Sequence, residues 1–233
     1  YWPSPTVIGP WLNLNATRPP FNDVRIRKAV NLAMDRTAAV KVLGEGDAYI
    51  GSVFAPGYGF SEVELLQLLG YRQPKDADLR EAKQLLAETG VKDLSFTIIA
   101  RSPKIQQESG VFIINQMAQI GIKARLEILE DAKYFERAIG RDHDAVINTP
   151  AITIVPDAHW AGRYFHPNSR EGYSGFTDPE FLRLWDAQIR ILDSAKRKEA
   201  LKEFEKKMLA EWVPIVPVFW QKSYIAAWPY VTG

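Results

Sequence analysis

The stretch that most constrains the fold of this chain is residues 19–36, with the sequence PPFNDVRIRKAVNLAMDR. The Pro-Pro pair interrupts any strand before it, and Asn22 or Asp23 can then cap the first turn of a helix. The apolar residues that follow recur at helical spacing, at Ile26, Ala29, Val30 and Ala33. The sequence therefore predicts an amphipathic helix that docks through this face, with Arg27 and Arg36 among its outward residues. We expect the helix to continue to Gly44.

The middle of the chain predicts an alternation of helices and strands. Residues 76–90 form a helical pattern that Gly90 should end, with one apolar face made by Leu79, Ala82, Leu85 and Leu86. Residues 94–100 are rich in β-branched and aromatic residues and predict a strand. Residues 122–129 alternate apolar with charged side chains and predict a second, half-exposed strand. The helix between them is expected over residues 106–120, with an inward face made by Val111, Ile114, Met117 and Ala118. A strand, a helix and a strand in this order favour a right-handed crossover between parallel strands, so we expect an α/β protein.

Further elements are expected on either side of this unit. Residues 7–15 predict one strand, residues 131–139 a helix and residues 144–148 a buried strand. Pro179 suits the first turn of a helix, whose apolar stripe would be Leu182, Trp185, Ile189 and Leu192. A second helix is expected from about Ala195, and extended runs at 214–220 and 223–228.

The composition excludes several classes of function. Lys plus Arg (29) and Asp plus Glu (28) nearly cancel, so nucleic acid and anionic membranes have no basic surface to bind. The chain has no cysteine, which excludes a thiol nucleophile, a disulfide framework and a cysteine-ligated metal. His143, His159 and His166, even with Asp157, match no standard metal-site spacing, and we expect no metal and no cofactor. No G-x-S-x-G or Ser-x-x-Lys box is present, so we expect no enzyme, with a hydrolase as the alternative.

The most promising binding segment is residues 148–165, because it follows a predicted buried strand of an α/β sheet. It is rich in polar and aromatic side chains, and Arg163 can form two parallel hydrogen bonds to a carboxylate. The alternative for its aromatic residues is packing within the domain. The candidate ligand-binding residues are Asn148, Thr149, Thr153, Asp157, Trp160 and Arg163.

Two signatures resemble those of family 5 extracellular solute-binding proteins, the oligopeptide, dipeptide and nickel receptors of bacterial ABC importers. The first is residues 13–36, with Asn13, Thr17 and the Pro-Pro-Phe, Asp-x-Arg-x-Arg and Asp-Arg pattern. The second is residues 82–90, which match Ala-Lys-x-Leu-Leu-Ala-Glu-x-Gly. The resemblance extends over nearly all of the chain. It implies that residues 1–233 are one domain, the C-terminal lobe of a type II periplasmic-binding-protein-like fold, with a mixed sheet flanked by helices.

The same resemblance implies a function. The lobe would belong to a longer two-lobed receptor that captures a small solute and delivers it to an ABC transporter permease, as a monomer and without catalysis. The receptor would be periplasmic or extracellular, and a lipoprotein in some hosts. The chain shows no signal peptide and both ends look cut, so we expect the lobe alone to bind weakly or not at all. A sensory or regulatory ligand-binding domain of the same fold is the alternative.

One departure from the family concerns the ligand. Peptide receptors of this family carry a Trp, and a few residues later an Asp that pairs with the peptide's α-ammonium group. Counted back from Pro156 and Asp157, these positions hold Thr149 and Ile152. A hydrocarbon side chain cannot stabilise a buried cation, which predicts discrimination against peptides with free amino termini, unless Asp157 takes over that role.

Overall fold

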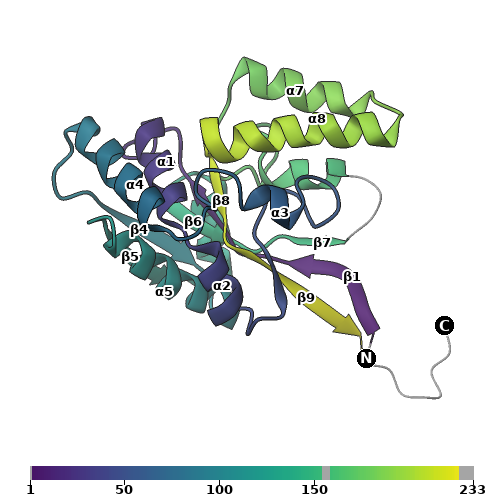
Figure 1. The fold of residues 1–233 in the computed structure, drawn as a ribbon. Coiled ribbons are helices and arrows are strands. Elements are labelled where there is room, and N and C mark those ends of the chain that lie inside the picture. Colours follow the sequence, from purple (N-terminus) through teal and green to yellow (C-terminus); the bar gives the residue numbers. More distant parts are fainter. Residues whose placement is uncertain (1, 154–157, 226–233) are drawn as a thin grey trace.

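The computed structural model describes residues 2–153 and 158–225, which form two sheets flanked by helices (Figure 1). The strands are β1 (Trp2–Ile8), β2 (Trp11–Leu14), β3 (Ala48–Ile50), β4 (Ser95–Ala100), β5 (Lys123–Ile128), β6 (Ala145–Asn148), β7 (Ala151–Thr153), β8 (Ile215–Pro217) and β9 (Phe219–Ile225). The helices are α1 (Val24–Ala33), α2 (Arg36–Val42), α3 (Glu62–Leu65), α4 (Asp76–Thr89), α5 (Lys104–Ala118), α6 (Asp131–Ile139), α7 (Pro179–Ile189) and α8 (Ser194–Lys207). A 3₁₀ segment, η1 (Ala158–Tyr164), and a π-helical segment, η2 (Met208–Trp212), complete the described elements.

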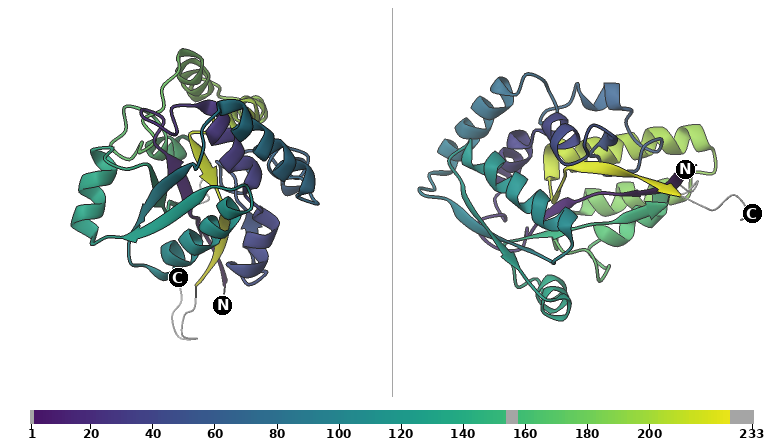
Figure 2. Two further views of the ribbon diagram at one scale, coloured as in Figure 1. Left: turned by 90° about the vertical axis from the view of Figure 1, so that its left-hand side faces the viewer. Right: turned by 90° about the horizontal axis from the view of Figure 1, so that it is seen from below.

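The first sheet has the order β3-β9-β1-β7 and is antiparallel, and the second has the order β5-β4-β6-β2-β8 and is mixed. In the second sheet β4 runs parallel to both β5 and β6, as the predicted crossover through α5 requires. Ile98 of β4 packs in the cluster that α1 and α5 cover, whereas the next residue, Ile99, packs against Tyr134 of α6 on the opposite face. The views in Figure 2 show helices on both sides of this sheet, as expected for an α/β fold.

The single strand predicted over residues 7–15 is two strands that lie in different sheets. The break falls at Gly9 and Pro10, between β1 and β2. A Cβ atom at position 9 would collide with the Phe219 carbonyl oxygen, so only glycine allows the two chain segments to approach each other here. The chain therefore passes from one sheet to the other at this point.

The helix predicted to continue through residues 37–44 is interrupted. Asp23 caps α1 as expected, with its side chain accepting a hydrogen bond from the Arg25 backbone nitrogen at 2.8 Å. The helix ends at Met34 in an extended conformation, and the Asp35 side chain then accepts a hydrogen bond from the Ala38 nitrogen at 3.0 Å. Asp35 thus begins a second helix, α2, in a new direction.

Arg27 and Arg36, predicted to face outward, are both buried, with 4% and 2% of their surface exposed. Arg27 donates from Nε to the Trp212 carbonyl at 2.8 Å and from Nη1 to the Phe21 carbonyl at 2.6 Å. Its burial lowers its pKa to about 10. These contacts tie α1 to the distant segment η2, and they show that charged residues of the first signature serve the fold.

The inward face of α5 also differs from the prediction. Val111 is 55% exposed and Ala118 is also exposed, whereas Met117 is buried as predicted and Ile114 packs partly buried against the core. The other buried apolar residues are Phe112 and Ile113. The helix is rotated because Gly110 faces Leu126 of β5 so closely that a Cβ atom there would collide with the leucine side chain. Likewise Leu192, predicted to lie on the apolar stripe of α7, follows the end of that helix and is 99% exposed.

His143 should make the fold sensitive to acid. The side chain lies between α6 and β6, is 1% exposed, and burial lowers its pKa from 6.5 to about 4. Its neutral form therefore supports folding above pH ~6.5, and this contribution is lost as the pH falls through about 4. We expect a loss of up to roughly 3 kcal/mol in unfolding free energy across this range. Urea titrations at several pH values should show a flatter profile for His143→Gln than for the wild type, and equal profiles would contradict this prediction.

Candidate functional site

Two strand ends of the mixed sheet bring polar residues to one edge. Because β4 and β6 are parallel, the residues that follow them lie at the same edge of the sheet. Arg101 follows β4, while Asn148 ends β6 and Thr149 comes next. Asn148 and Thr149 were predicted from the sequence, whereas Arg101 was missed. Part of its signal was available, since it is the first residue after a strand predicted to pair in parallel with residues 122–129, but the pairing with residues 145–148 was not predicted. We call Arg101, Asn148 and Thr149 the carboxyl-edge cluster.

A buried glutamine at the start of α5 links the two strand ends. Gln106 accepts a hydrogen bond from the Arg101 backbone nitrogen at 2.7 Å and donates one to the Thr149 hydroxyl at 3.0 Å. The Asn148 side-chain nitrogen, next to this link, is buried and has no hydrogen-bond partner in the part of the chain that the structure describes. It is a donor whose burial is costly unless a ligand or water accepts from it.

The Arg101 guanidinium is held by aromatic rings and a weak ion pair. It lies 5.6 Å from the ring centre of Tyr134 and 5.2 Å from that of Phe135. Its Nη1 atom is 3.4 Å from the Asp131 carboxylate, and its buried Nε atom makes no hydrogen bond within residues 2–153 and 158–225. The side chain is 25% exposed, so an anionic group can reach a guanidinium that is already oriented.

Arg163 is positioned differently from the expectation of an open carboxylate site. Its Nη2 atom forms an ion pair with Glu171, and its guanidinium lies 5.3 Å from the Tyr164 ring centre. The pKa of nearby Tyr173 is raised to about 12, chiefly by burial and then by Glu171, while Arg101 and Arg163 act in the opposite direction. Arg101 and Arg163 therefore both lie close enough to Tyr173 to influence its pKa. A solute carboxylate at Arg163 has to compete with Glu171.

The other predicted residues lie further along the chain. Thr153 is in β7, opposite Thr6 of β1, and Trp160 belongs to η1. Asp157 lies outside the described residues. Strand β7 joins the carboxyl-edge cluster to the sheet that contains β1 and β9, so this segment lies on the same side of the domain as those two strands (Figure 1).

Within the described residues, no group of three or more His, Asp or Glu side chains is arranged to hold a metal ion. A search of the same residues found no helix with the length and apolar character that crossing a membrane would require.

Comparison with known proteins identifies the family. A sequence model described as bacterial extracellular solute-binding proteins, family 5 Middle, matches residues 2–172. The chain is 27% identical over 220 residues to the Di/tripeptide-binding protein 1 of Pseudomonas aeruginosa, covering 89% of this chain and 39% of that protein. It is 30% identical over 230 residues to the periplasmic oligopeptide-binding protein OppA of Haemophilus influenzae, covering 94% of this chain and 41% of that protein.

Solved structures confirm the predicted fold class. The crystal structure of Haemophilus influenzae OppA in complex with the peptide RPPGFSPFR superposes with a TM-score of 0.82 at 23% identity, covering 95% of this chain and 44% of that one. The murein tripeptide binding protein MppA of Escherichia coli gives a TM-score of 0.80 at 15% identity, covering 95% of this chain and 44% of that one. The chain spans about two fifths of the length of the curated relatives that it matches. On the family match, which extends over most of its residues, the chain belongs to the bacterial extracellular solute-binding proteins of family 5.

Proposed function

We propose that this chain is the C-terminal lobe of a receptor that captures a small solute for an ABC importer, and that residues 1–233 form one ligand-binding domain. The observation that carries the proposal is the carboxyl-edge cluster, which lies beside the sheet that contains β1 and β9. A second lobe connected through those strands would face this edge and close over the solute. Binding is reversible, with no bond made or broken.

The solute is a peptide or a peptide-like compound that carries a carboxylate. Support comes from the names of the relatives, which bind dipeptides, tripeptides or oligopeptides. The carboxylate meets the Arg101 guanidinium, and the Asn148 side-chain nitrogen donates to a neighbouring oxygen of the solute. Thr149, Thr153, Asp157, Trp160 and Arg163 form the rest of the wall.

The partners and the location follow from the same proposal. The receptor delivers its solute to an ABC transporter permease in the membrane and works in the periplasm or outside the cell. Support for this location comes from the name of its relative OppA of Haemophilus influenzae, a periplasmic oligopeptide-binding protein. It uses no cofactor and no metal. A sensory role for the same lobe would give the same solute binding but no uptake. Comparing the uptake of a labelled solute by cells with and without the gene distinguishes the transport role from the sensory role.

Calorimetric titration of the complete gene product with a mixed set of short peptides tests the site. We expect Arg101→Ala to weaken binding of carboxylate-bearing solutes by about 10- to 100-fold, because a charge-assisted hydrogen bond of about 1.5–3 kcal/mol is lost. Arg125→Ala, which removes an exposed arginine of β5, is the matched control and should leave the affinity unchanged. Equal affinity of the wild type and the Arg101 variant would place the carboxylate elsewhere.

The same titration tests the ligand class. Peptides with acetylated amino termini should bind better than their free-amine counterparts, because Ile152 offers nothing to an ammonium group. Tight binding of free-amine peptides that acetylation abolishes would contradict this and point to Asp157 as the anchor. In that case Asp157→Asn should remove the preference for free-amine peptides.

A further inference from the structure

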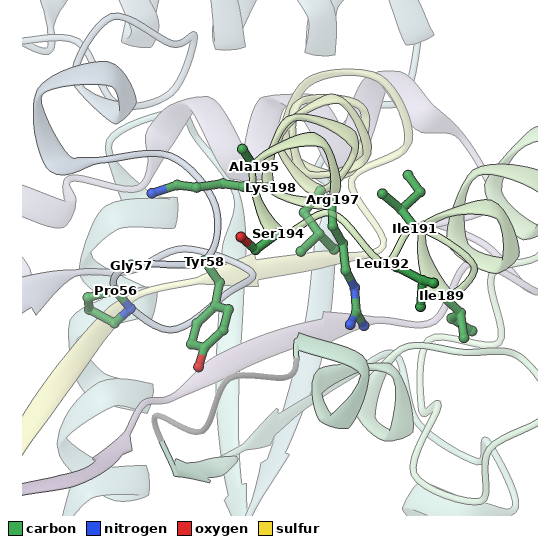
Figure 3. A pocket seen from close by; sticks show the side chains of 11 residues that line it. Pro56, Gly57, Tyr58, Ile189, Ile191, Leu192, Ser194, Ala195, Arg197 and Lys198 are labelled. Atoms are coloured by element: carbon green, nitrogen blue, oxygen red, sulfur yellow. The ribbon is translucent and has the colours of Figure 1, made fainter.

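A cavity of about 620 Å³ lies between the α7–α8 hairpin and the loop that joins β3 to α3 (Figure 3). Its volume is that of a small-molecule site, and it shares no lining residue with the carboxyl-edge cluster. Pro56, Gly57 and Tyr58 form the loop side, and the apolar residues of the hairpin side are Ile189, Ile191, Leu192, Ala195 and Leu201. We call it the hairpin cavity.

The charged residues of the hairpin cavity are all of one sign. Arg197 and Lys198 line it, and none of its described lining residues is an aspartate or a glutamate. The Arg197 Nε atom donates to the Gln188 side-chain oxygen at 2.9 Å, and Gln188 is fully buried, so the guanidinium is fixed in place. In Figure 3 the Arg197 and Tyr58 side chains extend into the same space from opposite sides. The cavity lining thus combines apolar walls with two basic side chains.

The loop side of the hairpin cavity is rigidly supported. The buried Glu205 carboxylate of α8 accepts hydrogen bonds from the Ser52 hydroxyl and from the backbone nitrogens of Val53, Phe54 and Phe60. Residues 56–58 lie within the loop that these bonds close. A site whose walls are held before binding loses little entropy when it is occupied.

The hairpin turn exposes apolar surface around this cavity. Leu192 is 99% exposed and Ile189 is 42% exposed. Covering such side chains removes apolar area from water, at about 25 cal/mol per Å². An occupant with an apolar body gains this burial, and a single negative charge on it gains the attraction of Arg197 and Lys198.

We propose that the hairpin cavity binds a small apolar anion, of the class of a medium-chain carboxylate. Its hydrocarbon part lies against Tyr58, Leu192 and Leu201, and its carboxylate faces Arg197, while the Lys198 ammonium adds a positive charge at the other end of the cavity. This site is separate from the solute site proposed above, and its occupation does not depend on that function.

Isothermal titration of the 233-residue chain with sodium dodecanoate below its micellar concentration is the direct test. We expect one site, a weaker affinity at high salt, and at least tenfold weaker binding of dodecanol and of dodecylammonium. Leu192→Asp and Lys198→Glu should each weaken dodecanoate binding by about tenfold or more, since each removes a favourable contact and adds a negative charge. Both positions are exposed, and thermal melts should confirm that the variants fold.

Matched substitutions elsewhere distinguish the hairpin cavity from general surface binding. Val63→Asp changes another exposed apolar residue, and Lys104→Glu another exposed lysine, and both should bind dodecanoate as the wild type does. Equal losses in these controls, or equal binding of dodecylammonium, would overturn the proposal. The proposal would also be overturned if the free chain self-associated and Leu192→Asp abolished this association, because a second copy of the chain would then occupy the cavity. Arg101→Ala should leave dodecanoate binding unchanged.

Discussion

Replacing Arg36 by alanine should lower the free energy of unfolding by about 3–5 kcal/mol, the cost of removing one partner from a buried polar network. The guanidinium donates to the Pro217 carbonyl at 2.8 Å, to the Gly70 carbonyl at 2.8 Å and to the Asn31 side-chain oxygen. It also lies 4.0 Å from the ring centre of Tyr71. Its loss takes a donor away from three buried acceptors, although the Gly70 carbonyl keeps the Lys75 ammonium at 3.0 Å, and it opens a cavity. The effect therefore exceeds that of an ordinary surface substitution.

Equilibrium unfolding in urea measures this effect. Arg80→Ala removes an exposed arginine from α4 and should change the unfolding free energy by less than about 0.5 kcal/mol. Arg36→Lys should give an intermediate loss, because an ammonium group cannot reproduce the planar set of donors. If Arg36→Ala were as stable as Arg80→Ala, the network would contribute nothing to the fold.

Replacing Glu205 by alanine should cost a similar amount, about 3–5 kcal/mol. The carboxylate is fully buried and is the acceptor for the Ser52 hydroxyl and for three backbone nitrogens, those of Val53, Phe54 and Phe60. Burial raises the pKa of Glu205, and the four donors partly offset that rise. Without the carboxylate these donors are left in a region that water does not reach, so the loop between β3 and α3 should loosen.

Amide hydrogen exchange reports this loosening residue by residue. In Glu205→Ala the amides of Val53, Phe54 and Phe60 should exchange faster, while those of β4 should change only through the loss of global stability. Glu203→Ala, two positions earlier on the exposed side of α8, is the matched control and should leave the loop amides protected. Unchanged protection of all three amides in the Glu205 variant would mean that other contacts hold the loop.

The elements that the sequence predicted well are those whose ends are marked by local chemistry. Helix α6 has the predicted bounds, α4 ends at Gly90 in a left-handed conformation with φ of 72°, and α7 begins at Pro179 behind the Asp178 cap. Each of these signals depends on neighbours within one turn, so a single sequence contains it.

Features that depend on distant contacts were not predicted. Arg27 and Arg36 look like surface residues on a helical wheel, and only the carbonyls of Trp212 and Pro217, far along the chain, make their burial favourable. The rotation of α5 depends on the meeting of Gly110 and Leu126, and the division of residues 7–15 depends on how closely Phe219 approaches Gly9. A pattern of apolar residues does not contain this information.

The candidate site also contains some residues that local sequence signals predict and others that depend on distant contacts. Asn148 and Thr149 were predicted because a ligand site is expected after a buried strand of an α/β sheet. Arg101 joins them only through the parallel pairing of β4 with β6, across more than forty residues of sequence. The pairing of Arg163 with Glu171 depends on how the chain folds back after η1, which the sequence pattern does not specify.

The pairing of β1 with β9 has a mechanical consequence. Trp2 is opposite Ile225 and Ile8 is opposite Gln221, so the start of one strand and the end of the other lie side by side. A pulling force applied at these two points would load the ladder one hydrogen bond at a time, as in a zip, instead of shearing all of them together. The antiparallel sheet should therefore open under low tension, from the end near Trp2 towards Gly9. The five-stranded sheet contains neither strand and would feel the load only after β1 and β9 had separated.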